Sequence, residues 1–246
     1  MNQKGQVTLY VMVGIVILVI VGLLVFFKGS LLNIITPRED VIKNVEVQQV
    51  VSLAKECMTS SFEDSLILVG KLGGTIVPQS NSYLYRNIPL KINYNLGESK
   101  VSSLDVISQE IEEYVKKESA DCLKESKQNV ELSVNNVVID FNQDTTDTVI
   151  NYQVKGSVGE IVFDHKDEVG ISLPVRFSYL HNAVLEIVTA TIEDPANIDV
   201  DLVLSYGLNV TIENPEETVL IYILRDNQSL VRGGGYEYVF ANLFEN

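Results

Sequence analysis

Two cysteines, Cys57 and Cys122, are the residues best suited to covalent chemistry in this 246-residue chain. Each falls on the apolar face of a segment with helical spacing, a pattern that fits either two separate buried thiols or one disulfide. An even number of cysteines beyond a membrane anchor favours the disulfide, which would join the two helices in an oxidising compartment. The chain has neither C-x-x-C nor clustered cysteine and histidine, so we expect no zinc site.

The residues whose spacing best suits a cation-binding loop are Asp140, Asn142 and Asp144, which fit the pattern D-x-N-x-D. An EF-hand loop would continue with Gly at position 145 and Glu at position 151, but the chain has Thr145 and Asn151. An EF-hand is therefore excluded. An acidic hairpin turn is the simpler interpretation, with a looser calcium turn as the alternative, and we expect no metal and no cofactor.

No catalytic motif is recognisable in the sequence. It contains no G-x-S-x-G, no H-E-x-x-H, no phosphate-binding loop and no G-x-G-x-x-G after a strand. His165 lies in an expected hairpin turn, residues 164–167, where a solvated polar side chain is the ordinary case and a metal ligand is the alternative. We therefore expect that the protein is not an enzyme.

Two weaker sequence signals would suit a domain that is exposed outside the cell. Two N-x-S/T triplets begin at Asn209 and Asn227, and in an exported domain they could accept a glycan, although such triplets also arise by chance. A tyrosine-rich stretch could stack on a glycan or partner, but tyrosines more often cover the edge of a core. It comprises Tyr83, Tyr85 and Tyr94.

The placement of the chain follows from its charge and hydropathy. A formal net charge of −15 accompanies a mean hydropathy of +0.16 because residues 7–27 are apolar and uncharged, whereas all 33 acidic residues follow them. A helix of this length spans a bilayer, and a cleaved signal peptide would have a shorter apolar region. The acidic remainder argues against a nucleic-acid binder, and the single run argues against a polytopic transporter.

The expected topology is a single-pass membrane protein. Residues 1–6 would form a cytoplasmic tail, residues 7–27 the transmembrane helix and residues 28–36 a connector to an extracytoplasmic part. Positive charges are nearly balanced across the run, so they do not decide the orientation. The short N-terminal tail and the exterior features favour a cytoplasmic N-terminus.

The residues Lys4-Gly5-Gln6, directly before the apolar run, resemble the processing site of archaeal type IV pilin precursors. The resemblance implies cleavage between Gly5 and Gln6 and assembly of the helix into a filament. The pilin pattern favours Glu at the fifth mature position, where this chain has Tyr10. A pilin-like subunit is therefore the alternative to a simple anchored protein.

The remainder of the chain predicts an α+β fold, with two helices packed on an antiparallel β-meander and further strands at the C-terminus. A first helix runs from Thr36-Pro37 to Gly73-Gly74, and a second begins at Ser102-Ser103. Period-two strands follow from residue 130, with a bulge at Asn135-Asn136. Helical spacing returns near residues 180–192, and residues 198–212 alternate as a strand.

The domain boundaries expected from this pattern place an α+β domain at residues 37–195 and a C-terminal β module at residues 196–246. A single domain is the alternative.

The order of elements and short motifs resembles an uncharacterised family of anchored surface proteins from small-genome archaea. The motifs are the KGQ anchor, Glu56-Cys57-Met58, the glycine turn of residues 68–74 and Asp121-Cys122-Leu123, and the similarity covers residues 1–195. It supports the disulfide and the topology and implies no established activity.

The function expected from the sequence is a structural or protein-interaction role at the cell surface. The partners would be the lipid bilayer, through residues 7–27, and other envelope proteins or copies of the same chain. A membrane-anchored enzyme or glycan-binding module is a further alternative.

Overall fold

A computed structural model describes residues 39–244, apart from residues 78, 79, 81 and 128. The chain divides into two compact units, residues 1–49 and 50–246, and the fold below is that of the second. The expected transmembrane run, the connector and the processing site at Gly5 and Gln6 lie outside the described residues. Among the described helices, none is both long and apolar enough to cross a bilayer.

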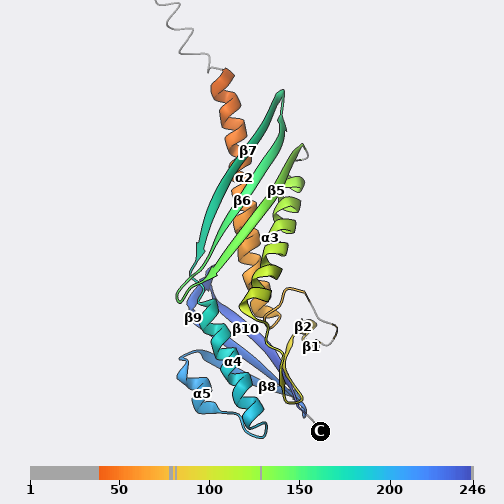
Figure 1. The fold of residues 1–246 in the computed structure, drawn as a ribbon, viewed down its shortest axis with the longest axis vertical. Helices are drawn as coiled ribbons and strands as arrows, with labels where there is room; N and C mark the ends of the chain where they lie inside the picture. Colours follow the sequence, from red (N-terminus) through yellow and green to blue (C-terminus); the bar gives the residue numbers. More distant parts are fainter. Residues whose placement is uncertain (1–38, 78–79, 81, 128, 245–246) are drawn as a thin grey trace, which may run out of the picture. The chain divides into compact units, whose positions relative to one another are not determined.

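Two long helices form the first layer (Figure 1). They are α2, Glu39–Lys71, and α3, Leu104–Ser126. The expected start of the second helix is confirmed, because the Ser103 hydroxyl caps α3 by accepting a hydrogen bond from the Val106 amide. The expected apolar face of α2 is buried, from Val50 to Val69.

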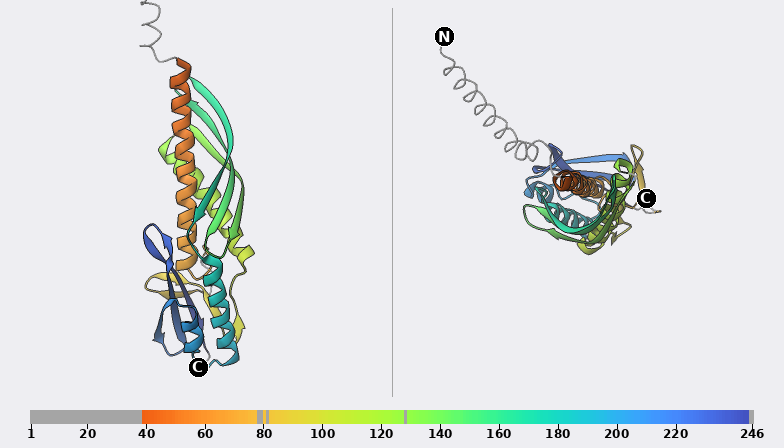
Figure 2. Two further views of the ribbon diagram at one scale, coloured as in Figure 1. Left: turned by 90° about the vertical axis from the view of Figure 1, so that its left-hand side faces the viewer. Right: turned by 90° about the horizontal axis from the view of Figure 1, so that it is seen from above.

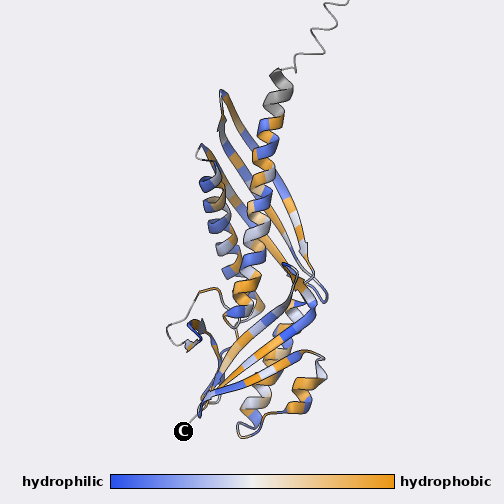
Figure 3. Cartoon of the chain, turned by 180° about the vertical axis from the view of Figure 1, so that it is seen from behind, coloured by the Kyte–Doolittle hydropathy of each residue, from blue (hydrophilic) through white to orange (hydrophobic). Residues whose placement is uncertain are grey.

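A three-stranded antiparallel sheet packs on these helices (Figure 2). Its strands are β5, Val130–Phe141, β6, Thr146–Val158, and β7, Ile161–Leu173. Hydrophilic and hydrophobic residues alternate along them (Figure 3), which is typical of a sheet with one buried face. The register shifts between Val134 and Asn136, confirming the bulge. The turn expected at residues 164–167 is wrong: these residues lie within β7, and the chain turns at Gly159.

A second sheet of five strands has the order β4-β3-β10-β9-β8. Its strands are β3, Ile92–Asn95, β4, Glu98–Ser99, β8, Asn209–Glu216, β9, Val219–Val231, and β10, Gly234–Leu243. All pairs are antiparallel except that of β10 with β3. The strands after residue 195 therefore complete a sheet with residues before it, and residues 50–246 form one compact unit.

Two further helices and a small hairpin accompany this sheet. They are α4, Phe177–Glu193, as the helical spacing predicted, α5, Val200–Ser205, and the hairpin of β1, Tyr83–Tyr85, with β2, Ile88–Leu90. The strand expected from residue 198 is wrong before Asn209. Asp199 caps α5 by accepting from the Leu202 amide at 2.9 Å, so a helical turn forms where the residues alternate.

The turn after α2 depends on Gly74. Its φ of +91° is a left-handed conformation, and a Cβ there would lie 2.1 Å from the Tyr238 hydroxyl oxygen. The Gly74 amide also donates to the Val69 carbonyl at 2.8 Å, closing the end of the helix. Glycine is therefore required both by the backbone and by the packing of β10 against this turn.

We predict that Gly74→Ala lowers the free energy of unfolding by about 3 kcal/mol, since it combines an unfavourable φ with a steric overlap. The matched control is Gly97→Ala, where φ is +89° but no atom lies within 4 Å of the added Cβ. That variant should lose only about 1 kcal/mol. Urea unfolding measures both, and equal losses would show that the contact with Tyr238 is unimportant.

Candidate functional sites

The disulfide expected from the sequence is present. Cys57 on α2 and Cys122 on α3 are bonded with a Cα–Cα distance of 5.8 Å, and no described cysteine is free. Cys57 is only 2% exposed. Disulfides persist in oxidising compartments, so the bond indicates an extracytoplasmic location for this part of the chain.

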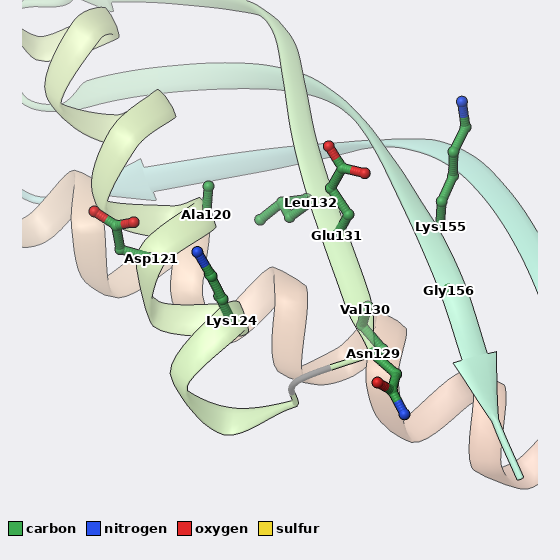
Figure 4. Close-up of a pocket in the computed structure, with 9 residues that line it drawn as sticks. All are labelled: Ala120, Asp121, Lys124, Asn129, Val130, Glu131, Leu132, Lys155 and Gly156. Atoms are coloured by element: carbon green, nitrogen blue, oxygen red, sulfur yellow. The ribbon is translucent and has the colours of Figure 1, made fainter.

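A groove of about 600 Å³ lies beside the C-terminal end of α3 (Figure 4). It opens between that helix and strands β5 and β6. Two acidic and two basic side chains line it. Their charges balance, so the groove favours neither anions nor cations. Its lining residues are Ala120, Asp121, Lys124, Asn129, Val130, Glu131, Leu132, Lys155 and Gly156.

The weak cation candidates lie around the turn between β5 and β6. Asn142 donates from its side chain to Asp147 at 2.7 Å, and its backbone amide donates to the Thr145 carbonyl at 2.9 Å. These bonds close the turn around the Asp147 carboxylate, a residue that the sequence pattern did not single out. In the described part of the chain, no three metal-ligating side chains gather, at Asp140 and Asp144 or elsewhere.

His165 lies beside an ion pair that joins α2 to β7. Lys55 donates to Asp167 at 2.9 Å, and the His165 ring lies 3.8 Å from the same carboxylate. The hydrogen bond from Lys55 lowers the pKa of Asp167 below its usual value. Both partners of the ion pair are more than one-third exposed, so it holds the sheet on the helix only weakly.

The two glycosylation triplets differ in accessibility. Asn209 and Thr211 are both exposed on β8, at the edge of the five-stranded sheet. In the second triplet Asn227 is exposed, but Ser229 is fully buried and its hydroxyl donates to the Asp226 carboxylate. Only the first triplet therefore presents both of its recognition side chains to solvent, and glycosylation at either stays a prediction.

The tyrosine-rich stretch does not form one stacking surface. Tyr83 donates to Glu216 at 3.0 Å and Tyr85 to Glu213 at 2.5 Å, which ties the small hairpin to β8. Tyr94 is 3% exposed and packs on the Phe244 ring at 5.1 Å. Two of the tyrosines thus join the hairpin to β8, and the third belongs to the hydrophobic core.

A buried polar cluster that the sequence did not reveal lies between α4 and the five-stranded sheet. Lys91 is 4% exposed and donates from Nζ to the Ser102 hydroxyl. His181 on α4 is equally buried, and its Nε2 lies 2.7 Å from the Ser102 carbonyl oxygen. Nearby, the side-chain amide of Asn93 and the hydroxyl of Tyr238 are fully buried and lack partners among the described residues.

Burial shifts the pKa values of the two basic groups in this cluster. It lowers the pKa of Lys91, and the field of the Glu110 carboxylate only partly opposes it. It also lowers the pKa of His181, which the hydrogen bond with Ser102 partly opposes. Burial therefore disfavours the charged form of both groups.

We predict that the disulfide contributes about 4 kcal/mol to stability, because it closes a loop with a sequence separation of 65. The double variant Cys57→Ala with Cys122→Ala should unfold at a correspondingly lower urea concentration. A reductant should bring the wild-type protein to the same midpoint and leave the double variant unchanged. Alkylation of both cysteines without reductant would contradict the bond.

Comparison with known proteins gives no match for this chain: no family model fits it, and no curated protein or solved structure is significantly similar. The resemblance to anchored archaeal surface proteins stays a prediction.

Proposed function

We propose that this protein is a single-pass membrane protein that displays residues 50–246 outside the cell for a structural or protein-interaction role. The observation that carries the proposal is the bond between Cys57 and Cys122, since such a bond persists where thiols are not kept reduced. The apolar run of residues 7–27 supplies the anchor. The strong acidity of the remainder suits a solvated outer surface.

Three exposed apolar side chains within seven residues support the interaction role. Ile198, Val200 and Leu204, in and just before α5, are 39%, 55% and 64% exposed. Large side chains that gather in this way on a surface commonly mark a contact with another protein. Envelope proteins or copies of the same chain are the partners that this location offers.

We predict that protease added to intact cells removes the displayed domain. The cleaved chain should lose the part after the anchor, whereas a cytoplasmic marker protein in the same cells should stay intact. The same protease added to lysed cells should cut both proteins. Protection of the domain in intact cells, with digestion after lysis, would overturn the proposed orientation.

We further predict that the full chain resists extraction by alkaline carbonate. Substituting Ile17→Lys together with Leu18→Lys should release it, since each lysine at the centre of a span costs about 3 kcal/mol. Ile17→Leu is the matched control and should stay in the membrane fraction. Release of the wild-type chain would show that residues 7–27 do not anchor it.

A pilin-like subunit is the second candidate, and it rests on the Lys4-Gly5-Gln6 sequence. The mass of the intact mature protein discriminates the two functions. A chain that begins at Gln6 would favour the filament subunit, whereas a chain that retains Lys4 and Gly5 would favour the simple anchor.

A further inference from the structure

A hairpin brings Lys91 and Ser102 together. In the pairing of β3 with β4, Tyr94 lies opposite Ser99 and Asn95 opposite Glu98. The Lys100 amide donates to the Asn93 carbonyl at 2.7 Å, which extends the same register. Lys91 and Ser102 lie two residues beyond this bond, and their side chains meet in a hydrogen bond. The Lys91 backbone is also held in place, because its amide donates to the Leu72 carbonyl at 2.9 Å and its carbonyl accepts from the Ala241 amide at 3.2 Å.

The amine of Lys91 is unusual because it is buried without a carboxylate partner among the described residues. A lysine held inside a protein ordinarily pairs with an acid or extends its amine to water. Glu110 is the nearby acid, but its carboxylate accepts from the Thr75 hydroxyl and from the Ile76 amide. The hydrogen bond of the Lys91 amine goes to Ser102 instead.

Ser102 is held from the other side by α4. The Nε2 of His181 contacts the Ser102 carbonyl oxygen at 2.7 Å, and α4 contacts both β3 and β4. His181 thus acts on the backbone of Ser102 and leaves its hydroxyl facing Lys91. His181 is a positioning residue in this arrangement.

Ser102 is the more exposed member of the pair. Ser102 is half-buried and Ser103 beside it is exposed, whereas the Lys91 amine is shielded from water. Ser102 directly precedes the N-cap of α3, a helix of 23 residues. The first amides of a helix have no partner within it, and they can stabilise negative charge that develops on an acyl oxygen.

We propose that Ser102 and Lys91 form a nucleophile and general base that accept an acyl group from an ester or amide. In the deprotonated form of Lys91 the hydrogen bond between the two groups reverses, and the Ser102 Oγ forms a bond to the acyl carbon while its proton moves to the Lys91 amine. The bond from that carbon to the leaving group breaks, and the leaving group takes the proton from Lys91. Water then releases the acyl group as a carboxylic acid by the same two steps in reverse order.

This inference goes beyond the display role and is independent of the anchor and its orientation. No sequence motif reveals the pair, because its members flank the two strands of a hairpin. It also runs against the sequence-based expectation that the protein is not an enzyme.

The test uses the full chain in detergent and a fluorophosphonate probe, which reacts with activated serines. The Ser102 oxygen displaces fluoride from phosphorus, and the mass of the chain rises by one phosphonyl group. Peptide mapping of the labelled wild-type protein should place that group on Ser102. Denatured protein should not react. Absence of labelling, or labelling spread over other serines, would overturn the proposal.

Matched variants identify the base. Ser102→Ala should abolish labelling, whereas Ser133→Ala, at an exposed serine on β5, should retain it. Lys91→Met should slow labelling about 100-fold, as expected for loss of a general base. His181→Gln should slow it less and leave its pH dependence in place. An unchanged rate in Lys91→Met, with an unchanged melting temperature, would overturn the assignment of the base.

The pH dependence of the wild-type protein gives a readout that does not depend on how any variant folds. The titratable groups that face Lys91 are Glu110 from α3 and His181 from α4. The labelling rate should rise along one titration with a midpoint below the ordinary lysine pKa of about 10.4. A rate that follows hydroxide without a plateau would contradict a base of lowered pKa.

Discussion

The covalent bond between α2 and α3 is the constraint on which the other layers depend. It fixes one point of contact between two helices of 33 and 23 residues whose apolar faces share one core with the three-stranded sheet. Most of the stability of helices in proteins comes from packing of an apolar face and not from helical propensity. The disulfide thus joins the two helices, and the sheet provides the surface on which their apolar faces pack.

The bond also influences a sheet that it does not touch. Strands β3 and β4 lie within the loop between Cys57 and Cys122, and β3 pairs in parallel with β10 near the end of the chain. Parallel pairing requires a long connection, and here that connection runs through β5 to β9. The loop closed by the disulfide therefore carries the strand that pairs with the C-terminal hairpin, and both belong to the compact unit of residues 50–246.

Much of the fold could be predicted because local signals and burial agree in many segments. The cap at Ser103, the apolar face of α2 and the bulge near Asn135 each follow from a short pattern with one physical cause. The strand predicted at residues 198–208 is wrong because Val200, Leu202 and Leu204 alternate in the sequence but do not form a buried strand face. A single cap at Asp199 and the turn at Gly207 determined the local structure instead.

The buried cluster could not be predicted for a different reason. A lysine and a serine eleven positions apart form a recognisable pair only when the folded chain brings their side chains into contact. The hairpin in turn is short, and its turn residues Leu96 and Gly97 both adopt positive φ. The helix α4 follows much later in the chain, and it brings His181 to the same serine. A polar site made by long-range packing costs desolvation energy, and here that desolvation favours the neutral amine on which nucleophilic chemistry at Ser102 would depend.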